Sequence, residues 1–175
     1  MRALALTLVF AALAIPALAQ PATPKGTLAD IGFLVGDWTS GTGKVADTGD
    51  TDRGGSKITV EADGAALLRQ DHTEIFDAHG KATGAFHQIM LIYPEGGTLH
   101  ADYSDGEGHV IHYVRAEVVA GRSVVFTAPA QAAAPGFRLT YTLIAKNQLG
   151  VLFGLLPPGG APFHEIASGS LHKAN

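Results

Sequence analysis

The sequence predicts an all-β protein, a single up-and-down antiparallel β-barrel of about ten strands. From residue 28 to the C-terminus, hydrophobic residues recur with a period near two, and turn-forming residues recur about every ten positions. No segment between the turns has the helical pattern that a crossover between parallel strands requires. An even number of strands beyond eight leaves interior room. A two-sheet sandwich is the alternative architecture.

Residues 1–19 have the pattern of a secretory signal peptide. Arg2 precedes an apolar stretch at 3–15, Pro16 interrupts it, and Ala-Leu-Ala at 17–19 forms a small-residue cleavage site. The apolar stretch is shorter than the roughly 18 residues of a membrane-spanning helix. We therefore expect a periplasmic or secreted protein that is not inserted in a membrane after cleavage, with a disordered leader at 20–26 and one β-barrel domain at 27–175.

The charge balance excludes some partners. Removing Arg2 from the 12 Lys and Arg residues leaves 11 against 16 Asp and Glu, a net charge of −5. Binding to nucleic acid requires a basic surface that neutralises phosphates, so no nucleic-acid partner is expected. The chain has no cysteine, which excludes disulfides and a thiol nucleophile.

A short helical turn is expected at residues 27–34, before the first strand. Apolar residues stand at 28, 31, 33 and 34, and Thr27 is a candidate N-cap. Such a turn would plug one end of a barrel. Trp38, the only tryptophan, follows it, and we expect its side chain to be buried against the turn.

The predicted strands follow in chain order. They cover residues 37–45, 57–61, 67–76, 86–93, 99–103, 109–118, 124–127, 137–146, 151–156 and 163–172. The polar segment at 46–55 is expected to be a loop. Its aspartates resemble part of a calcium-binding loop, but Gly54 stands where an oxygen ligand is needed. The glycines at 41 and 43 lack the following helix of a dinucleotide site.

Side-chain alternation predicts which residues face the interior. The apolar residues expected inside are Val110, Val114, Val124, Phe126, Leu139 and Leu143. Three polar side chains, Tyr103, His112 and Tyr141, are expected among them. His72 shares a strand face with Glu74, which predicts a buried acid–imidazole pair. An imidazole and two phenols in an apolar interior indicate a ligand pocket, ordered water or mutual hydrogen bonds.

The segment Phe-Leu-Val-Gly-Asp-Trp-Thr-Ser-Gly-Thr-Gly at 33–43 resembles the opening strand of calycin-like barrels, in which a Gly-x-Trp packs against the barrel end. More narrowly, it is similar to nitrobindin-type haem-binding barrels and related secreted families. This resemblance implies a barrel fold and, if haem is bound, a histidine ligand at the start of the closing strand. The matching position is His164, with Ala167 three residues on.

The sequence favours an exported, non-enzymatic β-barrel that binds a small, largely apolar molecule in its interior, without a cofactor. The candidate ligand-binding residues are Trp38, His72, Tyr103, His112, Tyr141 and His164. Three alternatives stay open: a haem protein with His164 as the metal ligand, a filled barrel that acts through surface contacts, and an enzyme built around His72, Glu74 and His112.

Overall fold

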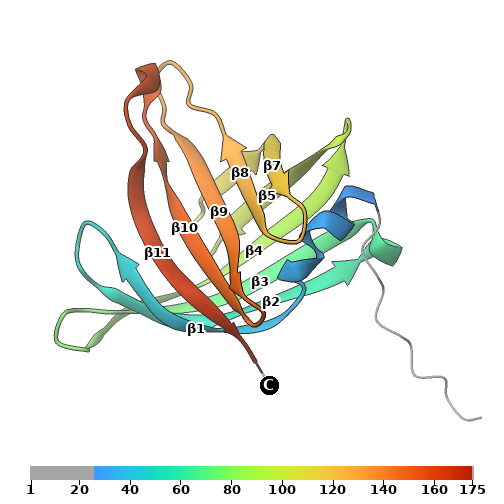
Figure 1. Ribbon diagram of the computed structural model, residues 1–175. Coiled ribbons are helices and arrows are strands. Elements are labelled where there is room, and N and C mark those ends of the chain that lie inside the picture. The colour runs from blue at the N-terminus through green and yellow to red at the C-terminus, as the bar shows by residue number, and fades with distance from the viewer. Residues whose placement is uncertain (1–25, 175) are drawn as a thin grey trace, which may run out of the picture.

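The computed structural model describes residues 26–174, which form one antiparallel sheet with a short helix at one end (Figure 1). The sheet has 11 strands in the order β6-β5-β4-β3-β2-β1-β11-β10-β9-β8-β7. Each strand pairs with its neighbour in the chain except at β6 and β7, and β1 pairs with β11. The predicted all-β, up-and-down antiparallel arrangement is confirmed, and the sandwich alternative is wrong.

The elements match the predicted segments, except that several strands are longer than predicted and one is divided. In chain order they are η1 (Gly26–Leu34), β1 (Gly36–Val45), β2 (Thr51–Glu61), η2 (Ala62–Gly64), β3 (Ala66–Phe76), β4 (Ala82–Glu95), β5 (Thr98–Asp105), β6 (Val110–Tyr113), β7 (Arg115–Val119), β8 (Ser123–Ala128), β9 (Gly136–Ala145), β10 (Gln148–Leu156), η3 (Pro158–Gly160) and β11 (His164–Lys173). The predicted signal peptide, and the leader up to residue 25, lie outside the described residues.

The sheet curls, and at Val114 the chain passes from one edge strand of the sheet to the other. This residue alone separates β6, which pairs with β5, from β7, which pairs with β8. The Val114 amide donates to the carbonyl oxygen of Thr127 at 3.2 Å, and β5 lies against β7. The sheet is therefore barrel-like, and the single predicted strand at 109–118 is divided by a bend.

The bend at Val114 corrects the predicted orientation of β6. Ile111 and Tyr113 are the buried residues, with 6% and 2% of their surface exposed, whereas Val110 and Val114 are 59% and 48% exposed. Past the bend the alternation shifts by one, so that Ala116 packs against the core. Placing Val110, His112 and Val114 inside was wrong, because the sequence pattern does not show the shift.

The 3-10 helix η1 fills one end of the curled sheet, next to the turns that follow β4 and β7 (Figure 1). Leu28, Ile31 and Leu34 are fully buried. The Gly121 amide donates to the carbonyl oxygen of Asp30 at 2.7 Å, which ties the helix to the turn between β7 and β8. This arrangement confirms the predicted helical turn and its role as a plug.

Trp38 joins η1 to the sheet. Its side chain is 2% exposed, and its Nε1 donates to the carbonyl oxygen of Leu34 at 2.7 Å. The Nζ of Lys173 on β11 lies 5.3 Å from the centroid of the indole ring and donates to the carbonyl oxygen of Val35 at 3.2 Å. The predicted burial of Trp38 against the turn is confirmed.

Among the described residues, no helix is long and apolar enough to cross a membrane.

Candidate functional site

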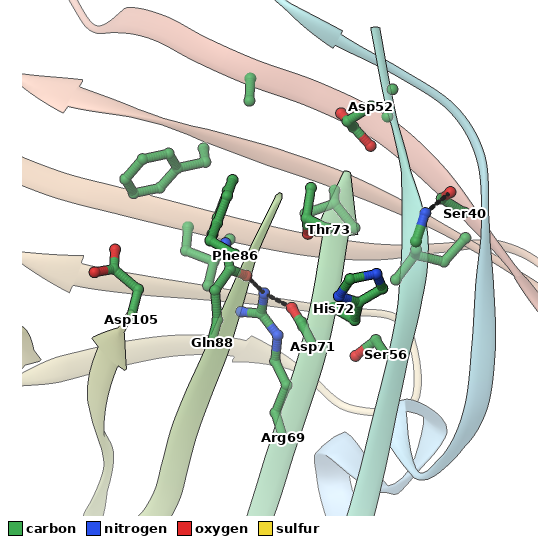
Figure 2. Close-up of a pocket in the computed structure, with 18 of the residues that line it drawn as sticks. Ser40, Asp52, Ser56, Arg69, Asp71, His72, Thr73, Phe86, Gln88 and Asp105 are labelled. Atoms are coloured by element: carbon green, nitrogen blue, oxygen red, sulfur yellow. Dashed lines mark hydrogen bonds and ion pairs between the residues drawn. The ribbon is translucent and has the colours of Figure 1, made fainter. Parts of the chain in front are cut away.

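A cavity of about 440 Å³ occupies the half of the barrel-like sheet away from η1 (Figure 2). Strands β1 through β6 and β9 through β11 contribute to its wall. Its apolar wall consists of Val45, Ile75, Phe86, Leu139, Val151, Phe153, Ile166 and Leu171. The interior is thus filled at one end and hollow at the other.

A charged pair, Arg69 and Asp71, lies in the cavity wall on β3 (Figure 2). Their side chains are only 11% and 8% exposed and form an ion pair through Nη2 and Oδ2. The same guanidinium nitrogen donates to Oε1 of Gln88 at 3.2 Å, across the strand pair β3–β4. Burial alone would lower the pKa of Arg69, but the charge and hydrogen bond of Asp71, together with the nearby Tyr141 and Tyr113, outweigh it and raise the pKa, so Arg69 remains charged.

Three tyrosines surround this charged pair. Tyr103, Tyr113 and Tyr141 all line the cavity, and burial raises the pKa of each phenol. The Arg69 guanidinium lies 5.7 Å from the centroid of the Tyr141 ring. The three hydroxyls therefore stay protonated near neutral pH and are able to donate hydrogen bonds.

The part of the cavity wall that β1 and β2 form contains small residues and one acidic side chain. A side chain at Gly43 would displace the Asp52 carboxylate, which lies in the cavity wall, so glycine here leaves room for that carboxylate. Burial raises the pKa of Asp52. The Gly54 amide donates to Ser40 Oγ at 2.6 Å (Figure 2). The segment 46–55 was predicted to be a polar loop, which was wrong for residues 51–55, because these residues belong to β2.

Asp105 organises the rim of the cavity at the β5–β6 turn. Its Oδ1 accepts from the amides of Glu107 and His109, both at 3.0 Å. Its Oδ2 accepts from the Tyr103 hydroxyl at 3.0 Å and lies 2.9 Å from His109 Nδ1. Burial by itself would raise the pKa of Asp105, but these hydrogen bonds outweigh it and lower the pKa. The turn is therefore held in one conformation by an ionised carboxylate.

The structure places three of the six predicted site residues in the cavity wall, namely Tyr103, Tyr141 and His72. His72 only borders the cavity: alternation along β3 puts its ring on the outer face, 4.8 Å from that of His87. Its Nε2 lies 3.9 Å from Glu74 Oε1, and both side chains are about half exposed. The predicted pair exists, but its predicted burial was wrong.

The other three predicted residues lie elsewhere. Trp38 belongs to the plugged end. His112 projects from the outer face, 70% exposed, with Nδ1 at 2.6 Å from Asp102 Oδ1. His164 stands at the start of β11 with a half-exposed side chain, and its Nε2 lies 3.3 Å from Asp47 Oδ2. None of the three lines the cavity.

Sequence reasoning missed Ser56, Arg69, Asp71 and Gln88. A signal was present for Ser56, because the alternation that puts Ile58 inside continues to it along β2. For β3 the sequence pattern was ambiguous, since each face carries one leucine, Leu67 or Leu68. The pairing of Ile58 with Arg69 decides which face points inward.

Within residues 26–174 no group of three His, Asp or Glu side chains could hold a metal ion.

Comparisons with known proteins assign no family to this chain. No protein-family model matches the sequence, and no match is found among curated proteins. One similar solved structure is described as EF1p2_mFAP2b bound to DFHBI; it has 10% sequence identity and a TM-score of 0.47, and the similarity covers 85% of this chain and all of that one. The fold and the cavity define the class: an all-β, barrel-like protein with an interior cavity.

Proposed function

We propose that this protein is an exported, non-enzymatic binder of a small, largely apolar molecule, which it holds in the interior cavity. The observation that carries the proposal is the cavity of about 440 Å³, whose exposed lining surface is mostly apolar. Apolar cavities with a few convergent polar groups are the usual form of small-molecule sites. Export to the periplasm or outside the cell is supported by the signal-peptide pattern at residues 1–19.

The polar groups in the cavity indicate where the polar end of the ligand would lie. This place differs from the one that the sequence indicated. Sequence alternation suggested His112, which projects outward. In the cavity the polar groups are those around Arg69 and Asp71. The apolar part of the ligand would therefore contact residues such as Phe86, Val151 and Phe153, with its polar end toward β3.

The haem alternative requires His164 as the iron ligand. Its Nε2 faces Asp47 at the open rim rather than the cavity, so the residues present do not fit a haem inside the barrel. Of the other histidines at the cavity, the His72 ring lies 4.8 Å from that of His87, and His109 binds Asp105. Haemin titration tests this alternative directly: a Soret band abolished by His164→Ala would support it over the apolar ligand.

A dye-binding experiment tests the proposed function. Nile red, an uncharged hydrophobic dye, should bind the purified protein saturably, with enhanced fluorescence. Val151→Phe adds an aromatic ring to the cavity wall and should weaken binding about tenfold or more, about 1.4 kcal/mol. Val114→Phe is the matched control, because it adds the same bulk on the outer face, and it should bind like wild type.

Two results would overturn the proposal. If wild type shows no saturable binding of Nile red or of other apolar probes, the cavity does not serve as a binding site. If both valine variants bind the dye as wild type does, the dye occupies the outer surface. Circular dichroism of each variant shows whether the β-sheet is retained.

A further inference from the structure

Three buried polar atoms in the cavity wall have no hydrogen-bond partner in the protein. They are Ser56 Oγ, Asp71 Oδ1 and the Tyr141 hydroxyl. Ser56 is 6% exposed, Tyr141 is 1% exposed, and the Asp71 side chain is 8% exposed. Buried polar atoms in proteins are nearly always hydrogen-bonded, so three in one cavity indicate a partner that the chain does not supply.

The three atoms belong to one patch. Ser56 and Asp71 are direct cross-strand partners on β2 and β3, and Gln88 on β4 continues the same row. Directly opposed side chains on one sheet face lie close together. Tyr141 comes from β9, and its ring lies against the guanidinium of Arg69, the ion-pair partner of Asp71. A single small chemical group could therefore meet all three atoms.

The charges in this patch cancel. Arg69 carries one positive charge, and Asp71 matches it with one negative charge. An anionic group would gain from Arg69 but would meet the free oxygen of Asp71. A cationic group would be attracted by Asp71 but repelled by Arg69. Transfer of any ion from water into a buried site is costly unless an opposite charge there is unmatched, so the patch disfavours both.

The hydrogen-bonding capacities of the three atoms define which uncharged group of a ligand can bind them. A carboxylate oxygen such as Asp71 Oδ1 only accepts, so the ligand group must donate a hydrogen. The Tyr141 hydroxyl stays protonated and can donate, so the ligand group must also accept. Ser56 Oγ can take either role. An ether or ketone lacks the donor, whereas a hydroxyl provides both in one atom.

We propose that the cavity recognises an apolar molecule with an uncharged hydroxyl head group, an alcohol or phenol, whose oxygen lies among Ser56, Asp71 and Tyr141. This inference rests on the proposed function, that an apolar molecule enters the cavity, and adds the chemistry of its polar end. Asp71 Oδ1 accepts the hydroxyl hydrogen, and the Tyr141 hydroxyl donates to the hydroxyl oxygen. Selection among apolar molecules comes from the pairing of Arg69 with Asp71, which leaves no net charge for an ionic head.

Matched probes test the inference by displacement of Nile red at pH 8. Decan-1-ol, 1-methoxydecane, decanoate and decylamine share one alkyl chain and differ in the head group. Decan-1-ol should bind at least about tenfold more tightly than decanoate and decylamine, and about threefold to tenfold more tightly than the ether, which cannot donate. If decanoate or decylamine binds as tightly as decan-1-ol, or the ether equals the alcohol, the inference is overturned.

Variants locate the head group. Tyr141→Phe and Ser56→Ala each remove one hydroxyl from the patch and should weaken decan-1-ol binding about threefold to tenfold. Asp71→Asn leaves the charge of Arg69 unmatched and should shift the ratio of decanoate to decan-1-ol affinity toward decanoate by at least about tenfold. If Asp71→Asn does not fold, the two hydroxyl variants still decide.

The outcomes separate the two proposals. If wild type binds Nile red in the cavity but does not distinguish the four probes, the head-group inference fails and the proposed function stands. The inference also fails if Tyr141→Phe and Ser56→Ala both bind decan-1-ol as wild type does, because the hydroxyl then lies elsewhere or water fills the patch. If wild type binds no apolar probe at all, the proposed function itself fails.

Discussion

The two ends of this barrel-like sheet use the same strands for different purposes. At the end near η1, the inward side chains are aliphatic or aromatic and fully buried, as with Leu28, Ile31 and Leu67. At the other end, the same strands turn Asp52, Asp71 and other polar residues toward a cavity. One end thus supplies most of the apolar burial that stabilises the fold, whereas the other gives up burial to keep space.

Hydrogen bonding differs between the two regions in the same way. At the plugged end the indole nitrogen of Trp38 is satisfied by the carbonyl oxygen of Leu34. In the cavity, Asp71 Oδ1 and the Tyr141 hydroxyl have no partner. Leaving buried polar atoms unpaired lowers the stability of the fold. The apolar burial at the other end offsets this loss. The comparison predicts that stability and binding respond to different substitutions.

The largest effect is expected at the plugged end. Trp38→Ala should lower the free energy of unfolding by about 3–5 kcal/mol, because it removes a large buried aromatic ring and the hydrogen bond to Leu34. Chemical denaturation followed by circular dichroism measures this. Trp38→Phe keeps much of the ring packing and should cost less. A cost under about 1 kcal/mol for the alanine variant would show that this end does not carry the stability.

A slightly smaller loss is expected in the cavity wall. Asp71→Leu leaves the buried charge of Arg69 unpaired and should cost about 3 kcal/mol. The double variant Arg69→Met with Asp71→Leu removes both charges and should recover most of that loss, because paired buried ions contribute little net stability. Urea denaturation of wild type and the two variants measures this recovery. Equal costs for the single and double variants would mean that the unpaired charge of Arg69 is not the cause of the loss in Asp71→Leu.

The rim should confer a dependence of stability on pH. The pKa of Asp105 is lowered below its ordinary value of 3.8, so the folded state favours the ionised carboxylate. Its contribution is present above about pH 4 and is lost as the pH falls through the folded-state pKa. Asp105→Asn should therefore cost about 1–2 kcal/mol at pH 7 and less at pH 3. Unfolding of both proteins across this pH range measures the difference, and a difference that does not shrink on acidification would contradict it.

The smallest effect is expected on the outer face. His112→Ala removes an exposed imidazole bound to Asp102, and should change stability by less than about 0.5 kcal/mol. Nile red affinity should be unchanged, since this side chain lies outside the cavity. Weaker dye binding in this variant would mean that the ligand contacts the outer face of the sheet. The outer face and the cavity would then not differ in their role in binding.

The sequence by itself determined the sheet and its plug. The period-two pattern and the spacing of turns identified the strands, and the apolar residues before Trp38 predicted the short helix. These features depend on local pattern, which a single sequence displays. Tyr103 and Tyr141 were correctly placed at the interior because strands β5 and β9 keep one unbroken alternation.

Only the tertiary structure decided which face of the less regular strands points inward. The bend at Val114 reverses the alternation of β6 and puts His112 outside, and the pairing of β3 with Ile58 of β2 turns Arg69 and Asp71 inside. A slip of one residue exchanges the two faces of a strand, so the inward set depends on pairing with the neighbouring strand. The cavity and its polar patch arise from that pairing around the sheet, which no single segment of the sequence encodes.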